Sequence, residues 1–179
     1  MSISPQQTQI TFKPLAPEDL PLLYTWFKKT HVSKWWPTPE RHEDFFEKFL
    51  TRIRTKKCFP FLIFANAIPI GYIQYYHIDK PSERQPDHWL PELPETTIGT
   101  DQFIGEEAYL GKGYGTLMIK EFITYLFSTL EPTINMIIVD PQPENIAAIK
   151  CYEKIGFTHM GTYKNPWGLA VLMKYTKDR

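Results

Sequence analysis

The stretch Leu110-Gly111-Lys112-Gly113-Tyr114-Gly115-Thr116 places three glycines at alternating positions. It follows a strand-like run, Thr97 to Ile104, and precedes a helix-like run, Leu117 to Leu130. A glycine-rich turn that opens a helix leaves backbone N–H groups unpaired, and the missing side chains let an anion approach them. The pattern therefore predicts a phosphate-binding turn between a strand and a helix, although a plain flexible turn would have the same composition.

Length and composition are typical of one globular domain. The chain has 179 residues, of which 42% are hydrophobic and 22% charged. A chain of this size buries a continuous core without disulfides or a structural metal. We therefore expect one domain over residues 1–179, with a flexible N-terminus over residues 1–8. The aromatic share of 15% favours an aromatic-lined site in addition to the core.

The cysteines and the apolar segments indicate the compartment. Cys58 and Cys151 are too few for a disulfide framework, and neither they nor the scattered histidines have metal-ligand spacing. The polar start, Met1 to Thr8, lacks the basic and apolar regions of a signal peptide. The most apolar run, Phe59 to Ile73, is too short to span a bilayer. We therefore expect a cytoplasmic protein without a metal site.

The charges are balanced in number but unevenly distributed. The chain carries 20 Lys and Arg against 20 Asp and Glu, which argues against a general nucleic-acid-binding protein. Between Asp79 and Glu107, eight acidic residues stand against Lys80 and Arg84, so this segment has a formal charge of −6. Its first part, to Glu95, contains four prolines without periodicity, and we expect a long loop there.

Hydrophobic periodicity predicts the order of the elements. Strands are expected at Gln9–Lys13, Phe59–Ala65, Ile70–Ile78, Thr97–Ile104, Asn135–Val139, Phe157–Tyr163 and Leu169–Tyr175. Helices are expected at Pro17–Lys29, from Pro39 or Glu40 to Arg54, at Leu117–Leu130, and from the cap residue Asn145 to Ile155. Four-residue turns are expected at residues 66–69 and 165–168. The fold class is α/β (α+β), with a mostly antiparallel central sheet flanked by about four helices.

A polar turn, His31 to Pro37, ends in two adjacent tryptophans, Trp35 and Trp36. Adjacent loop residues do not easily both point inward. We expect one of them in the core and the other in the wall of a ligand pocket, because large aromatic side chains often form such walls.

The order strand, Gly-Lys-Gly-Tyr-Gly, helix, strand, and then Asn145 and Cys151-Tyr152-Glu153-Lys154-Ile155-Gly156-Phe157 resembles the GNAT superfamily of N-acetyltransferases. Within it, the sequence is most similar to the aminoglycoside 6'-N-acetyltransferases. The similar segments are Gly99-Thr100-Asp101-Gln102-Phe103, the glycine stretch, Asp140-Pro141 and Ala148 to Lys154. The likeness covers about Gln9 to Tyr175. One departure is Leu110, where the superfamily usually has Gln or Arg; this position contributes mainly its backbone.

The resemblance implies acetyl-CoA as the cofactor. The residues it implies for cofactor binding are Phe103, Ile104, Leu110, Gly111, Lys112, Gly113, Tyr114, Gly115, Thr116 and Asn145. The turn would hold the pyrophosphate at the start of the helix. Lys112 would add a positive charge, or is a solvated lysine. Asn145 would contact the pantetheine arm, or is a plain helix cap.

Two residues are candidates for proton transfer. Asp101 lies late on the strand before the glycine turn, where a carboxylate could hold a cationic amine and accept its proton; its alternative is a structural carboxylate at a strand end. Tyr152 follows Asn145 by seven residues, so both project from nearly the same side of a helix. The resemblance makes Tyr152 the general acid toward the coenzyme A sulfur, and its alternative is a core tyrosine.

Aminoglycosides carry several ammonium groups, so a receptor needs carboxylates around an open cleft. The expected substrate-binding residues are Trp35, Gln74, Tyr76, Asp87, Trp89, Asp101 and Asp140. For Asp87 and Trp89, the alternative is a solvated loop with one anchoring aromatic side chain. Partners are expected to be a cationic small-molecule amine and neither nucleic acid nor membrane; the oligomeric state stays open, with a monomer slightly favoured.

The resemblance therefore implies transfer of an acetyl group to the 6'-amine of aminoglycoside antibiotics, which would confer resistance. A first alternative is a GNAT-type acyltransferase of another small amine or hydroxylamine, such as a siderophore precursor. A second alternative is a non-catalytic acyl-CoA-binding module.

Overall fold

The computed structural model describes residues 8–37, 41–78 and 89–177. The chain groups into two compact units. Unit 1 comprises Met1–Tyr75 and Asp101–Glu121, and unit 2 comprises Tyr76–Thr100 and Phe122–Arg179. The chain passes from one unit to the other within two strands and one helix, and each unit is described by itself below.

Unit 1 begins with an antiparallel meander. β1 (Ile10–Pro14) pairs with β2 (Phe59–Ala65), which pairs with β3 (Ile68–His77). The turn between β2 and β3 has Asn66 and Ala67 as its central residues, both with positive φ (48° and 68°). Ala65 pairs with Ile68, so the four-residue turn lies at 65–68, and the expected position 66–69 was wrong by one residue. A two-residue turn of this hand matches the twist of the flanking strands and leaves Ile68 and Pro69 within β3.

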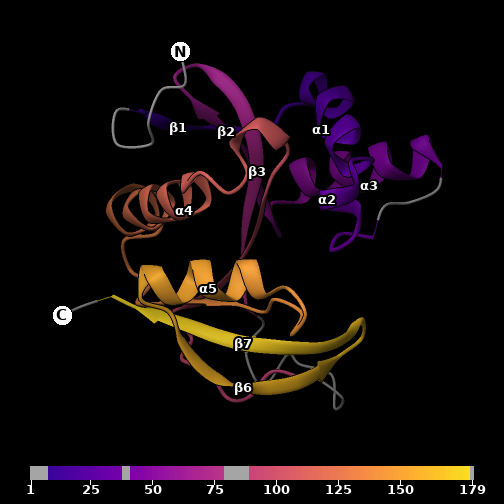
Figure 1. The fold of residues 1–179 in the computed structure, drawn as a ribbon. Coiled ribbons are helices and arrows are strands. Elements are labelled where there is room, and N and C mark those ends of the chain that lie inside the picture. The colour runs from indigo at the N-terminus through magenta and orange to yellow at the C-terminus, as the bar shows by residue number, and fades with distance from the viewer. Residues whose placement is uncertain (1–7, 38–40, 79–88, 178–179) are drawn as a thin grey trace. The chain divides into compact units, whose positions relative to one another are not determined.

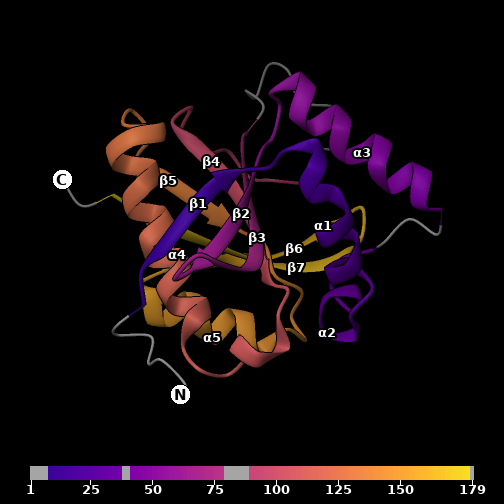
Figure 2. The ribbon, with the colours of Figure 1, turned by 90° about the horizontal axis from the view of Figure 1, so that it is seen from above.

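The helices of unit 1 follow β1. A 3₁₀ turn, η2 (Pro17–Asp19), leads into α1 (Leu20–Phe27), and α3 (His42–Thr55) follows after a short helix, α2 (Thr30–Ser33). The polar turn expected from His31 was therefore partly wrong, because the N–H groups of Val32 and Ser33 both bond to the Lys29 carbonyl and close a helical turn. The three α-helices lie together (Figure 2). Their buried side chains join residues of β2, β3 and β4 in one core.

Unit 2 contains the other strands. β4 (Thr97–Ile104) pairs in parallel with β5 (Met136–Val139) at residues 97–99, and β5 pairs antiparallel with β7 (Gly168–Thr176). β6 (Thr158–Asn165) lies antiparallel beside β7 as a hairpin (Figure 1). The complete hydrogen-bonded order is β1-β2-β3-β4-β5-β7-β6. The mixed, mostly antiparallel sheet predicted from the sequence is confirmed.

Two further helices carry parts of the expected site. α4 (Tyr114–Tyr125) begins three residues earlier than predicted and continues as a π-helical turn, η5 (Leu126–Leu130). α5 (Ile146–Ile155) has Asn145 as its N-cap and ends at Gly156, whose φ of 115° is in the left-handed region, as the sequence predicts. Among the described residues, no helix combines the length and apolar character that crossing a membrane requires.

The turn of the β6–β7 hairpin lies where the sequence predicts it. Asn165 pairs with Gly168, with Pro166 and Trp167 between them, so the four-residue turn comprises residues 165–168, as expected. The Oδ1 atom of Asn165 accepts a hydrogen bond from the Trp167 N–H over 2.9 Å. This local side-chain contact stabilises the short turn.

Candidate active site

The glycine stretch forms an exposed turn in unit 1. β4 is followed by η4 (Glu107–Tyr109), and α4 begins at Tyr114, where the Gly113 carbonyl accepts the Leu117 N–H over 3.1 Å. Gly111 and Gly113 have φ of 68° and 87°, values that residues other than glycine rarely adopt. A Cβ atom at Gly111 would meet no described atom within 4 Å. An exposed turn with open backbone at a helix start fits a phosphate group.

The other residues of this stretch have different environments. Lys112 is exposed, whereas Gly115 and Thr116 lie in the first turn of α4. The Tyr114 side chain is buried, with its ring edge-on to Tyr109 at 4.8 Å and its hydroxyl 3.3 Å from Thr8 Oγ1. Tyr114 can therefore contact a cofactor only through its backbone.

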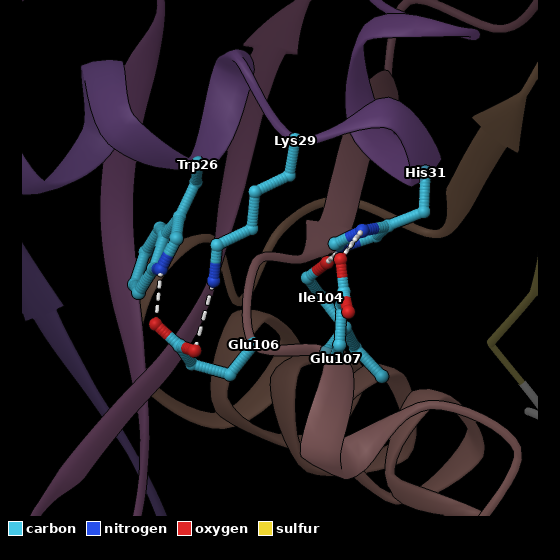
Figure 3. A network of polar contacts seen from close by, with 6 residues as sticks. All are labelled: Trp26, Lys29, His31, Ile104, Glu106 and Glu107. Atoms are coloured by element: carbon cyan, nitrogen blue, oxygen red, sulfur yellow. Dashed lines mark hydrogen bonds and ion pairs between the residues drawn. The ribbon is translucent and has the colours of Figure 1, made fainter.

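A group of polar contacts, the Glu106 network, holds the segment that connects β4 to the turn (Figure 3). The Nε1 atom of Trp26 donates to Glu106 over 2.6 Å, and the Lys29 ammonium donates to its other oxygen over 2.9 Å. These two hydrogen bonds lower the pKa of the Glu106 carboxyl. His31 Nε2 lies 2.9 Å from the Ile104 carbonyl oxygen. The contacts tie α1 and α2 to the end of β4.

The packing at the end of β4 limits which groups of Phe103 and Ile104 could contact a cofactor. The Phe103 ring is buried against the rings of Trp26, Phe27 and Trp36. The Ile104 carbonyl contacts His31. The Phe103 ring is therefore occupied in the core, and at this position the backbone groups are the ones that could bind a cofactor. Trp36 thus takes the core position expected for one tryptophan, while Trp35 is half-buried with the Lys34 ammonium 4.5 Å above its ring.

Asp101 belongs to a second group of contacts, the Gln74 network, made of Arg52, Cys58, Tyr72, Gln74 and Asp101. The Nε2 atom of Gln74 donates to Asp101 Oδ2 over 2.7 Å. Gln74 is only 4% exposed, and its Oε1 atom accepts hydrogen bonds within the chain. The structure therefore places the Gln74 amide among protein groups, and not on the open wall that the sequence suggested.

Burial and hydrogen bonding have opposite effects on Asp101. Burial raises the pKa of the Asp101 carboxyl, while the hydrogen bond from Gln74 and the positive charge of Arg52 oppose this rise; the net direction is upward. A carboxylate with a raised pKa is a stronger base than an ordinary aspartate. The position therefore suits proton acceptance from an amine.

In unit 2, α5 positions Asn145 and Tyr152. The Asn145 Oδ1 atom accepts the Ala148 N–H over 3.3 Å, so this oxygen caps the helix. Tyr152 is 7% exposed, and its ring lies 5.3 Å from that of Phe157. Both side chains thus have structural contacts, and their roles toward a cofactor stay predictions.

The remaining expected substrate residues also lie in unit 2. A Cβ atom on Gly99 would overlap the Tyr76 ring, at 2.5 Å from Cε2, so glycine is needed for this ring to lie against β4. Trp89 packs on a cluster that contains Leu93, Ile138 and Leu172, with its ring 6.5 Å from that of Tyr163. Trp89 therefore packs as the anchoring aromatic side chain that was the alternative to a substrate-binding role. Asp140 contacts Asn165 Nδ2 at 3.4 Å, and Asp87 lies outside the described residues.

Sequence reasoning missed several residues of the two networks, namely Trp26, Lys29, Glu106, Arg52, Cys58 and Tyr72. Their partners are 16 to 80 positions away in the chain, except for the Tyr72 contact to Gln74. The only local signal was Tyr72, which shares a strand face with Gln74. In the described part of the chain, no three His, Cys, Asp or Glu side chains are placed to hold a metal ion.

Known proteins resemble the chain along nearly its whole length. Residues 16–164 match the family model described as an acetyltransferase (GNAT) domain. An aminoglycoside N(6')-acetyltransferase type 1 from Klebsiella pneumoniae is 33% identical over 174 residues, which cover 94% of this chain and 84% of that protein. A kanamycin resistance protein from Rhizobium radiobacter is 39% identical over 90 residues, or 50% of this chain and 82% of that protein.

The fold also matches a solved structure closely. The aminoglycoside acetyltransferase AAC(6')-Ib, solved in complex with coenzyme A and kanamycin, superimposes with a TM-score of 0.82. The match covers 94% of this chain and 95% of that chain, with 33% sequence identity.

Proposed function

Because the chain belongs to the family of GNAT acetyltransferases, we propose that it transfers the acetyl group of acetyl-CoA to the 6'-amine of aminoglycoside antibiotics and thereby confers resistance. The observation that carries this proposal is Asp101, a half-buried carboxylate on β4 whose pKa is raised and whose Oδ2 is held by Gln74. Support comes from the similarity to an aminoglycoside N(6')-acetyltransferase over 94% of the chain.

The proposed cofactor site uses backbone groups of the exposed turn at the start of α4. The N–H groups around Gly111, Gly113 and Gly115 would hold the pyrophosphate, because the start of a helix favours negative charge. The exposed Lys112 ammonium would add an attraction to phosphate. The side-chain amide of Asn145 would contact the pantetheine arm. Acetyl-CoA, when bound, supplies an acetyl thioester whose carbonyl carbon reacts with the substrate amine.

The proposed proton transfers use two side chains. The substrate amine arrives as an ammonium ion, and the Asp101 carboxylate binds it and accepts one of its protons, directly or through water, leaving the neutral amine as the nucleophile. The hydroxyl group of Tyr152 donates the proton that the departing sulfur requires. The surplus ammonium groups of an aminoglycoside would pair with Asp140 and with carboxylates of the acidic segment.

The proposal concerns the whole chain as one catalytic domain. The family match runs from residue 16 to residue 164 and so includes parts of both compact units. We therefore propose that neither unit acts alone. A truncated protein that lacks the segment after Gly156 should neither bind coenzyme A nor release thiol.

The test is a thiol-release assay with acetyl-CoA and paired aminoglycosides that carry either an amine or a hydroxyl at the 6' position, such as neomycin and paromomycin. We expect turnover with the 6'-amino compound and little with its 6'-hydroxy partner. Turnover that is faster with hydroxylamine-type substrates would favour a siderophore-precursor acyltransferase. Coenzyme A binding without turnover of any amine would favour a non-catalytic module. Resistance is measured by growth of a susceptible host that expresses the gene.

A further inference from the structure

We propose that Gln74 and Arg52 are positioning residues for Asp101, which together fix its carboxylate and keep it ionised at neutral pH. This inference rests on the proposed function of Asp101 as the group that binds the amine and accepts its proton. It adds that two residues outside β4, Gln74 on β3 and Arg52 on α3, determine the position and the charge of the carboxylate.

The contacts define the orientation of the Gln74 amide. Its Oε1 atom accepts a hydrogen bond from Arg52 Nη1 over 2.9 Å and from the Tyr72 hydroxyl over 2.7 Å, with Cys58 Sγ at 3.2 Å. A guanidinium group can only donate, so the side of the amide that faces Arg52 must be the oxygen. The nitrogen therefore faces Asp101, where it can only donate.

This orientation favours one protonation state and one geometry of Asp101. An ionised carboxylate accepts a hydrogen bond more strongly than a protonated one, so the Gln74 N–H stabilises the charged form. The bond engages Oδ2 over 2.7 Å. Among the described residues, the Oδ1 atom of Asp101 receives no hydrogen bond. This second oxygen is the one left to meet an incoming ammonium group.

Arg52 supplies the charge behind this arrangement. In the described part of unit 1, the charged and titratable groups that face Asp101 are Arg52 from α3, Cys58 before β2 and Tyr72 from β3. Burial raises the pKa of the Cys58 thiol to about 11 and also raises that of Tyr72, so both are neutral at neutral pH. Arg52 contributes the positive charge of its guanidinium group. Its cation therefore opposes the effect of burial on Asp101.

The consequence is a compromise between basicity and ionisation. Burial alone would protonate a larger share of Asp101 and remove the base. Without burial, the carboxylate would be ionised but weakly basic. The Arg52 charge and the hydrogen bond from Gln74 both oppose the effect of burial, and together they permit the half-buried Asp101 to be both ionised and basic near neutral pH.

The experiment measures kcat/KM for a 6'-amino aminoglycoside as a function of pH. In Arg52→Gln the charge is lost, the pKa of Asp101 rises, and the acidic limb of the profile should move to higher pH by about one unit. Gln74→Glu, which has nearly the same size, replaces the amide that donates to Asp101 by a second carboxylate. It should therefore move the acidic limb to still higher pH. Arg52→Lys retains the charge and should restore the wild-type limb. Arg54→Gln is the matched control, because Arg54 is exposed near the end of the same helix.

A merely structural role would lower stability or kcat without moving the limb. Circular dichroism and coenzyme A titration show whether each variant is folded and binds cofactor. The proposal is overturned if folded Arg52→Gln and Gln74→Glu both keep the wild-type limb. If the wild type acetylates no aminoglycoside, the proposed function fails, and carboxyl NMR titration of Asp101 in the same variants still decides the inference. The pKa of Asp101 should then be higher in Arg52→Gln than in the wild type, and an unchanged pKa would refute the positioning role of Arg52.

Discussion

Unit 1 contains two candidate functional regions that are built in opposite ways. The turn from Leu110 to Gly113 is exposed, and what it offers a ligand is its backbone, shaped by the positive φ of Gly111 and Gly113. The Gln74 network consists of side chains that fix one another, and Gln74 at its centre is almost completely buried. Anion binding thus depends on backbone conformation, whereas proton acceptance depends on the charge and hydrogen bonding of neighbouring side chains.

This difference predicts separable defects. Substitutions in the turn should weaken cofactor binding and leave the pH dependence of turnover unchanged. Substitutions at or around Asp101 should alter turnover or its pH dependence and leave coenzyme A affinity unchanged. The variants Asp101→Asn and Gly111→Val below test whether the two regions are independent in this sense.

The largest effect is expected for Asp101→Asn. The amide can neither accept the amine's proton nor balance its charge, so kcat/KM for the aminoglycoside should fall by about 10³-fold. Coenzyme A affinity, measured by calorimetry, should stay within error of the wild type. Asp44→Asn, at an exposed carboxylate on α3, is the control and should change neither quantity. Wild-type turnover in Asp101→Asn would remove Asp101 from the mechanism.

Tyr152→Phe should have the next largest effect. Loss of the hydroxyl removes the proposed proton donor to the sulfur, so kcat should fall by about 10²-fold, while coenzyme A still binds. Tyr175→Phe is a matched control, because the Tyr175 ring also packs on Phe157, at 5.4 Å. If the two variants lose activity equally, the Tyr152 hydroxyl has only a structural role.

Gly111→Val tests the turn. A Cβ atom there meets no described atom within 4 Å, so the cost is backbone strain at a φ of 68° rather than a clash. Strain of about 1–2 kcal/mol should raise KM for acetyl-CoA by about tenfold and leave the pH profile in place. Gly168→Val also places backbone strain in the β6–β7 turn, where φ is 139° and space is open. This control should lower stability without raising KM, and an equal rise in both variants would contradict a specific role of the turn.

The smallest effect is expected for Glu106→Gln, which weakens two charge-assisted hydrogen bonds. Because the carboxyl is partly exposed, the loss of unfolding free energy should be only about 1 kcal/mol. The pKa of Glu106 is lowered in the folded protein, so its charge stabilises the fold above the ordinary glutamate pKa and this contribution is lost as pH falls through the lowered value. Urea unfolding should therefore show a difference between wild type and variant at neutral pH that shrinks under acid. A constant difference at all pH values would mean that the Glu106 charge contributes nothing.

The local features of the fold were predictable from the sequence because each depends on neighbours in the chain. The bounds of β2 follow from an apolar run, and both ends of α5 follow from a capping asparagine and a terminating glycine. The turn at Asn66 was expected one residue too late in the chain, since the strand pairing that decides its position is not visible in the turn sequence.

The Glu106 network and the Gln74 network could not be predicted from the sequence, for a related reason. Trp26 and Glu106 are 80 positions apart, and Arg52 and Gln74 are 22 apart, so no periodicity or motif connects them. Gln74 could be singled out by its polar character in an apolar strand, but its direction toward Asp101 depends on the pairing of β3 and β4. The expected substrate role of the acidic segment stays a prediction, because Asp87 lies outside the described residues.

The most direct test of the central claim is to locate the acetyl group in the product. The wild-type protein is incubated with acetyl-CoA and a 6'-amino aminoglycoside, and the isolated product is analysed by mass spectrometry and two-dimensional NMR. The account predicts one acetyl group, bonded to the 6' nitrogen, and no such product from Asp101→Asn over the same period. An acetyl group on a different amine, or an unmodified aminoglycoside beside intact acetyl-CoA, would contradict it.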